Sequence, residues 1–157
     1  SQEVLTAAAR HKGTSVTEIL QNCVIFNNGI HNPITDKEVR ADRTIHLRHG
    51  EKMIFGKDGD MGLVQDGFGL KAVKIGRDGY TIDDVLVHDA HTASNFLHQQ
   101  LAMMDGITLP LAVGVIRDVE APTYETGVSE QVDRVRAAKG FDSLRDMILA
   151  GETWTVD

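Results

Sequence analysis

The sequence is nearly free of cysteine: Cys23 is the single one among 157 residues. One cysteine excludes an internal disulfide, and it also excludes a metal site built entirely from cysteines of this chain. Long apolar runs are absent too, and neither a membrane span nor a secretory signal is recognisable. From these absences we expect a protein of the reducing cytoplasm.

Positive charge is also scarce. The chain has 16 Lys and Arg against 23 Asp and Glu, which gives a formal net charge of −7 and a pI of about 5.4. It therefore lacks the basic surface with which nucleic-acid-binding proteins contact phosphates. What is present is a hydrophobic content of 41%, which is typical of a globular domain with a real core.

The N-terminal segment has the pattern of the end of a domain. No initiator methionine precedes Ser1, residues 3–11 predict a helix with one apolar face, and residues 15–20 predict a strand. A helix, a glycine stop and a strand form the second half of a βαβ unit. Because a parallel strand needs neighbouring strands, we expect residues 1–30 to be the tail of a larger α/β domain and the chain to be a fragment.

The rest of the chain predicts alternating strands and helices, so the fold class that we expect is α/β, with the mixed α+β character of a fragment. The expected elements are a polar linker over 29–42 with a short helix at 36–41, two strands within 43–55 around His49-Gly50, two strands within 62–75 around Asp66-Gly67, a strand at 85–88, a helix at 92–105 capped by Thr92 or Ser94, a buried strand at 109–119, helices at 129–138 and 141–150, and an extended tail after Gly151.

The segment 88-HDAH-91 is a candidate metal site. His88 and His91 are spaced i and i+3, which places them on one face of a helix, and His98 follows one to two turns later. The alternative is that Asp89 caps the following helix and that the histidines are solvated. We favour this alternative, because no further carboxylate or histidine at a recognisable spacing completes a ligand set.

Two glycine-containing segments resemble cofactor loops but fit turns better. The segment 57-KDGDMG-62 is similar to part of a calcium loop, or to the motif that holds Mg²⁺-diphosphate in thiamine enzymes. A calcium loop needs glutamate at its twelfth position, which is Gly69 when counted from Asp58. Predicted strands flank the segment, so we interpret it as a tight turn. The GFG at 67–69 lacks the third glycine of a dinucleotide-binding loop.

Cys23, within 19-ILQNCVIFNN-28, has two interpretations. A lone thiol is most often a small buried hydrophobic group. The alternative is a thiolate ligand, because the cysteine follows the predicted parallel strand, at the edge where α/β domains place their sites. Polar side chains that could donate hydrogen bonds to sulfur or to a phosphate surround it: Gln21, Asn22, Asn27 and Asn28. The other ligands of such a site would come from elsewhere.

Several longer stretches resemble one family. Within residues 7–27, AARHKGTS and ILQNCVIFN are similar to the stretch that closes the thiamine-diphosphate domain in the β subunit of 2-oxoacid:ferredoxin oxidoreductases, most closely the 2-oxoglutarate type. The resemblance covers essentially the whole chain. The segments that resemble the C-terminal region of that subunit are RTIHLRHGEKMIFG (43–56), DGFGLKAV (66–73), VHDAH (87–91), GVIRDVEAPTYE (114–125) and GETWTVD (151–157).

The resemblance implies an enzyme that cleaves a 2-oxoacid oxidatively with coenzyme A, giving an acyl-CoA, CO₂ and reduced ferredoxin. In this family the β subunit binds thiamine diphosphate, Mg²⁺ and a [4Fe-4S] cluster held by four cysteines. The fourth cysteine is matched by Cys23, and Asn27 is expected near the cofactor. The resemblance gives no role to His31, His88 or His91, and it leaves the catalytic residues unknown.

The chain differs from the family in lacking the N-terminal half, with three cluster cysteines and the Mg²⁺-diphosphate motif. We therefore predict the C-terminal part of a β subunit, inactive and cofactor-free when alone, with 1–30 ending the thiamine-diphosphate domain and 31–157 forming a C-terminal domain. We expect this domain to pack on the α subunit or on a second β subunit, and to bind neither nucleic acid nor membrane. Two alternatives are a free-standing, non-catalytic α+β interaction module and a small metalloenzyme built on His88, His91 and His98.

Overall fold

The structure, a computed structural model, describes residues 2–140, 143–154 and 156. The chain divides into two compact units. Residues 1–11 and 15–120 form the first, which we name the sheet unit, and residues 12–14 and 121–157 form the second, the C-terminal unit. Parallel and antiparallel strand pairs both occur, so the predicted mixed α/β class is confirmed. The predicted domains 1–30 and 31–157 stay a prediction.

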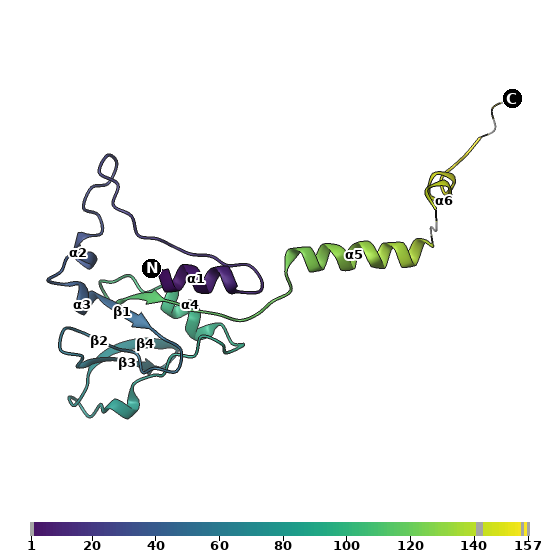
Figure 1. Ribbon diagram of the computed structural model, residues 1–157. Helices are drawn as coiled ribbons and strands as arrows, with labels where there is room; N and C mark the ends of the chain where they lie inside the picture. Colours follow the sequence, from purple (N-terminus) through teal and green to yellow (C-terminus); the bar gives the residue numbers. More distant parts are fainter. Residues whose placement is uncertain (1, 141–142, 155, 157) are drawn as a thin grey trace. The chain divides into compact units, whose positions relative to one another are not determined.

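The sheet unit contains five strands, four α-helices and one 3₁₀ helix among its described residues (Figure 1). In chain order they are α1 (Gln2–Arg10), α2 (Asn32–Thr35), α3 (Arg40–Arg43), β1 (Thr44–Leu47), β2 (Ile54–Phe55), β3 (Met61–Asp66), β4 (Gly69–Lys74), η1 (Ile82–Asp84), α4 (Phe96–Ala102) and β5 (Leu111–Gly114). The predicted helix at 3–11 is thus confirmed as α1.

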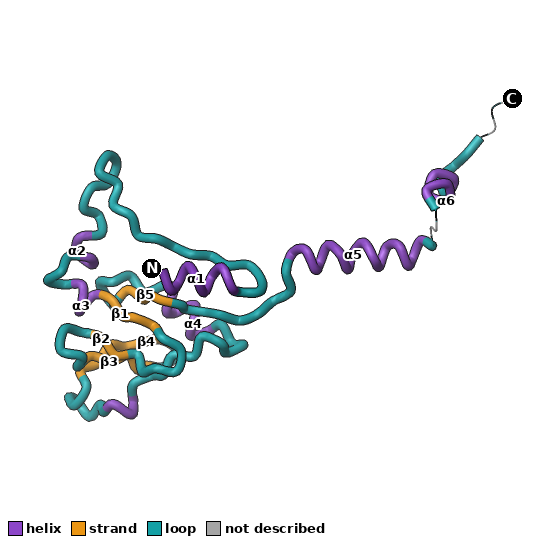
Figure 2. The backbone as a smooth tube through the Cα atoms, viewed as in Figure 1, coloured by secondary structure: helices purple, strands orange, loops and turns teal. Residues whose placement is uncertain are grey.

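The strands form two small sheets (Figure 2). β1 and β5 pair in parallel, with Ile45 opposite Ala112, and β2, β3 and β4 form an antiparallel sheet in that order. β3 and β4 make the hairpin predicted around Asp66-Gly67, and Gly67 has the positive φ, 57°, that the first central position of its two-residue turn requires. Residues 56–60 connect β2 to β3, so the turn predicted within 57–62 is confirmed.

The hydrophobic core is built from strands of both sheets together with α4. Burial alternates along β1, where Ile45 and Leu47 point inward and His46 outward, as period-two geometry requires. Each large side chain that is removed from water contributes about 1.5–3 kcal/mol, so this cluster is the main source of stability. Its buried members are Ile45, Leu47, Met53, Phe55, Leu63, Leu101 and Met104.

The predicted strand at 15–20 is wrong. The chain from the end of α1 to the start of α2 forms no helix or strand (Figure 2), and every residue of 15–20 is exposed. A parallel strand gains its hydrogen bonds from neighbouring strands, and none is described beside this segment. The linker prediction was also imprecise, because α2 ends before the short helix expected at 36–41 and α3 overlaps only its last two residues.

The two strands expected within 43–55 exist, but they do not pair with each other. β1 pairs with β5, and the backbone N–H groups of Gly50 and Met53 donate to the carbonyls of His88 and Leu86, both at 2.8 Å. Residues 85–88, rather than β1, are therefore the neighbours to which residues 50–53 are hydrogen-bonded. They pair through one isolated bridge, between Lys52 and Val87, rather than through the regular strand that we predicted.

Helix α4 and strand β5 are shorter than predicted. The guanidinium of Arg117 donates to the carbonyls of Thr92, Ala93 and Ser94. These carbonyls therefore accept hydrogen bonds from a side chain and not from backbone N–H groups of a helix. The helix consequently begins at Phe96, without the side-chain cap that we expected from Thr92 or Ser94. β5 ends at Gly114, and its residues are only partly buried.

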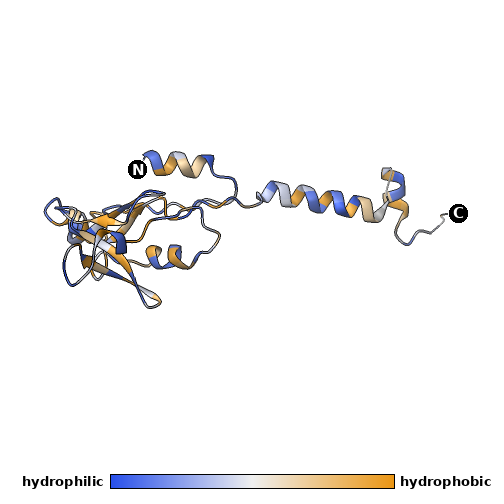
Figure 3. Cartoon of the chain, turned by 90° about the horizontal axis from the view of Figure 1, so that it is seen from below, coloured by the Kyte–Doolittle hydropathy of each residue, from blue (hydrophilic) through white to orange (hydrophobic). Residues whose placement is uncertain are grey.

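The C-terminal unit contains α5 (Tyr124–Lys139) and α6 (Leu144–Leu149). α5 begins before the predicted 129, because Thr123 Oγ1 accepts the N–H of Thr126 at 3.2 Å and caps the helix. The start of the helix predicted at 141–150 lies outside the described residues. Hydropathy is mixed along α5 (Figure 3), and none of the described helices is long and apolar enough to cross a membrane.

Replacement of Gly114 by alanine is expected to weaken the β1–β5 pair. Gly114 has a φ of 114°, and a methyl group there would lie 2.6 Å from the carbonyl oxygen of Leu47. We expect the free energy of unfolding to fall by at least about 1–3 kcal/mol, measured by urea unfolding followed by circular dichroism. Gly69→Ala in β4 is the control, because its nearest neighbour is Asp66 O at 3.7 Å. Equal stability of the two variants would contradict this role for Gly114.

Candidate functional site

Cys23 lies in a loop that its own asparagines close. Asn22 Nδ2 donates to Asn28 Oδ1 at 2.9 Å, and Asn22 Oδ1 accepts the backbone N–H of Gly29 at 2.8 Å. The N–H of Asn27 donates to the carbonyl of Cys23 at 2.9 Å. The loop follows an unpaired segment, so the expected position at the end of a parallel strand is wrong in this chain.

The thiol of Cys23 is exposed, so its interpretation as a buried structural group is wrong. Its pKa is lowered, chiefly by the backbone N–H of Phe26 and then by that of Ile25, because these dipoles stabilise the thiolate. Asn27 contributes a smaller backbone interaction of the same sign. The expected stabilisation of the sulfur thus comes from backbone amides, whereas the Asn22 and Asn28 side chains hold the loop.

The three histidines of the predicted metal site are hydrogen-bonded to backbone carbonyls instead. His88 Nε2 donates to Val115 O at 2.9 Å, His91 Nδ1 to Asp118 O at 2.7 Å, and His98 Nε2 to Asp89 O at 2.8 Å. Within residues 2–140, 143–154 and 156, no three His, Cys, Asp or Glu side chains are placed to hold a metal ion. The geometry does not support the metalloenzyme alternative.

The alternative that we favoured for this segment is also partly wrong. His88 and His98 are buried, with 1% and 3% of their surface exposed, rather than solvated. Asp89 does not cap α4, because its Oδ1 accepts the backbone N–H of His91 at 2.9 Å. Burial is the largest cause of a lowered pKa for His88, and the hydrogen bond to Val115 acts against it. The fold therefore favours the neutral form of His88.

Arg117 and Asp118 are central to this region, and the sequence assigned no role to either. Arg117 Nη1 donates to His98 Nδ1 at 2.9 Å. Asp118 makes three bonds: its carboxylate pairs with His11 Nδ1 at 2.7 Å, its N–H donates to Ala90 O at 2.8 Å, and its carbonyl accepts from His91. One sequence feature could have pointed to these two residues. They lie inside the stretch GVIRDVEAPTYE, one of the segments that carry the family resemblance.

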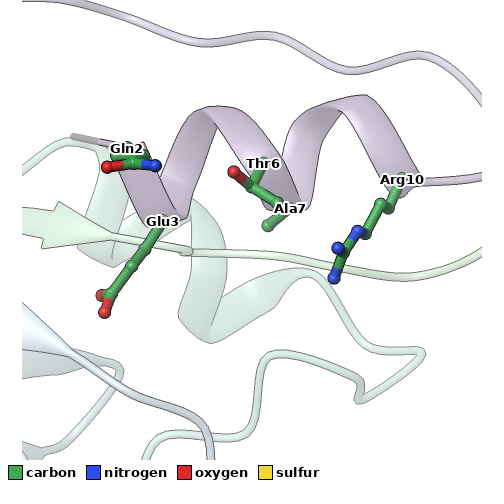
Figure 4. Close-up of a pocket in the computed structure, with 5 residues that line it drawn as sticks. All are labelled: Gln2, Glu3, Thr6, Ala7 and Arg10. Carbon is green, nitrogen blue, oxygen red and sulfur yellow. The ribbon is translucent and has the colours of Figure 1, made fainter.

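An open pocket of about 340 Å³ lies along α1 (Figure 4). Residues of one helix face line it, and they include one carboxylate and one guanidinium but neither Cys23 nor any histidine. We therefore assign it no catalytic function. Its lining residues are Gln2, Glu3, Thr6, Ala7 and Arg10.

The lowered pKa of Cys23 predicts an early onset of thiol reactivity. Because the thiolate is the reactive form, alkylation by iodoacetamide should reach half its maximal rate below the pH of about 8.5 that is typical of a free cysteine. The measurement is the alkylation rate as a function of pH, read by mass spectrometry. Asn22→Ala should open the loop and move this midpoint upward, whereas a midpoint at or above 8.5 in the wild-type chain would contradict the backbone stabilisation.

Comparison with known proteins gives one informative relative. No protein-family model and no solved structure matches the chain. The 2-oxoglutarate oxidoreductase subunit KorB of Mycobacterium tuberculosis (strain H37Rv) is 37% identical over 158 aligned positions, which cover 99% of this chain and 42% of that protein. The chain thus spans less than half the length of the relative that it matches. The resemblance predicted from the sequence motifs is confirmed: along nearly its whole length, this chain is related to a 2-oxoglutarate oxidoreductase subunit.

Proposed function

We propose that the chain is the C-terminal part of the β subunit of a 2-oxoacid:ferredoxin oxidoreductase that acts on 2-oxoglutarate. The observation that supports this most strongly is the 37% identity to a 2-oxoglutarate oxidoreductase subunit over 99% of the chain. The proposed reaction converts the 2-oxoacid and coenzyme A into an acyl-CoA and CO₂ and reduces ferredoxin. The other catalytic parts would belong to sequence outside this chain, in the same cytoplasmic enzyme.

In this proposal Cys23 is the fourth ligand of a [4Fe-4S] cluster. An exposed thiol whose thiolate is stabilised by the N–H groups of Phe26 and Ile25 fits the requirements of a cluster ligand. The chain has one cysteine, so three ligands would come from the missing part of the subunit. If bound, thiamine diphosphate would supply an electron sink for decarboxylation, and a cluster held in part by Cys23 would supply one-electron transfer.

A second role in the loop around Cys23 is proposed for Asn27. Asn27 bonds to Cys23 through its backbone, and no described group accepts from its side-chain amide. We propose that this side chain faces the bound thiamine diphosphate. The ligands of its Mg²⁺ would lie outside this chain, since the described residues form no carboxylate site for a cation.

The exposed segment 15–30 supports its assignment to a larger cofactor domain. It presents apolar side chains that a finished domain would bury, including Val16 at 91% and Phe26 at 88% exposure. We propose that the absent part of the subunit covers them and supplies the strands that 15–20 lacks. The part from 31 onward would be a C-terminal domain that packs on the α subunit or on a second β subunit.

The test is Cys23→Ser in the subunit that contains this chain, co-expressed with its partner subunit and purified without oxygen. We expect loss of the brown cluster absorbance, a lower iron content and loss of ferredoxin reduction, because serine is a poor ligand for the cluster. The matched control is Asn27→Ala in the same loop, for which we expect full iron content and weaker binding of thiamine diphosphate.

Unchanged iron content in Cys23→Ser would overturn the ligand role. If, in addition, the wild-type assembly contained neither iron nor thiamine diphosphate, the chain would instead be a non-catalytic α+β interaction module.

A further inference from the structure

We propose that His98 and Arg117 form a proton-sensitive latch that holds residues 92–95 and the start of α4 on the sheet unit. The latch consists of the His98 ring, the Arg117 guanidinium and the carbonyls of residues 92–94 that the guanidinium binds. Proton uptake by His98 would open it. This inference does not depend on the enzyme activity proposed above.

Hydrogen bonds fix the ionisation state in which the latch is closed. A carbonyl only accepts, so the 2.8 Å bond to Asp89 O places the single ring proton of neutral His98 on Nε2. A guanidinium only donates, so Nδ1 must offer its lone pair to Arg117 Nη1 at 2.9 Å. Both ring nitrogens of this buried side chain are thus satisfied in one neutral tautomer.

A second proton is incompatible with this geometry. It would bind Nδ1 and direct an N–H at the N–H of Arg117 across 2.9 Å, with two positive charges in contact. Arg117 would have to leave, and with it the bonds to Thr92, Ala93 and Ser94. Those bonds are what holds the loop before α4, so protonation of one ring would release a continuous segment.

Neighbouring charges strengthen this response. His88 lies edge-on to His98, with ring centroids 6.2 Å apart, and its Nδ1 is buried without a hydrogen-bond partner among the described residues. A proton there would add a further charge to the same interior region, so the burial of His88 favours the neutral, closed state. The charged or titratable groups that contact this pair or act on it electrostatically are His49, Asp89 and Arg117.

The experiment is hydrogen exchange of the 157-residue chain at pH about 7.5 and about 5, with each rate divided by the unstructured rate at the same pH. We expect the amides of 99–102, the first of which donates to Asn95 O at the start of α4, to lose about tenfold or more of their protection at the lower pH, while those of β3 and β4 keep theirs. His98→Gln is the matched variant: its amide oxygen can accept from Arg117 and its amide nitrogen can donate to Asp89, but it does not titrate.

His98→Gln should therefore keep its protection at both pH values. His46→Gln, at an exposed position of β1 outside the latch, should behave like the wild type. Unchanged protection of the amides of 99–102 in the wild type would overturn the proposal, and so would a loss shared equally by β3 and β4. If His98→Gln fails to fold, the ring nitrogens of His98 can be titrated by NMR in the wild type. Amide shifts at 92–95 that do not follow that titration would also overturn it.

Discussion

The sheet unit depends on the hydrogen bonds of two consecutive residues, Arg117 and Asp118. Arg117 binds the loop before α4 and the His98 ring, and Asp118 binds His11 at the end of α1 as well as the 88–91 segment. Three segments that are distant in sequence are thereby fixed to the chain that leaves β5. Hydrogen bonds to charged groups stabilise a fold more than neutral ones and cost more to lose. This dipeptide therefore determines how the 88–91 segment, the loop before α4 and the end of α1 are held.

The Cys23 loop follows a different principle. Its hydrogen bonds are local, and they bring the backbone N–H groups of residues 25–27 toward the sulfur without help from distant parts of the chain. A thiolate environment can therefore form even where the segment around it has no strand partners. This separation explains how one region combines a hydrogen-bonded loop around Cys23 with exposed apolar residues such as Val16 and Phe26.

Local sequence signals predicted local structure well. The α1 helix, the Asp66-Gly67 hairpin and the turn at 57–62 depend on residues close in sequence, and each was predicted. Long-range pairing was not predicted: β1 joins β5 rather than β2, and 85–88 replaces β1 as the neighbour of 50–53. The strand predicted at 15–20 was wrong for the same reason, because no described strand pairs with this segment. For the site, the sequence indicated Cys23 by its residue type. The exposure of Cys23 and the hydrogen bonds of Arg117 depend on the three-dimensional structure and could not be predicted.

The central proposal is that this chain is one part of a cofactor-binding subunit. The most direct test is to sequence the transcript upstream of Ser1. The account predicts an open reading frame that continues upstream and encodes three further cysteines, two of them in a Cys-x-x-Cys pair, together with a glycine–aspartate motif for Mg²⁺-diphosphate. An upstream frame without these cysteines, or a start codon directly before Ser1, would contradict it.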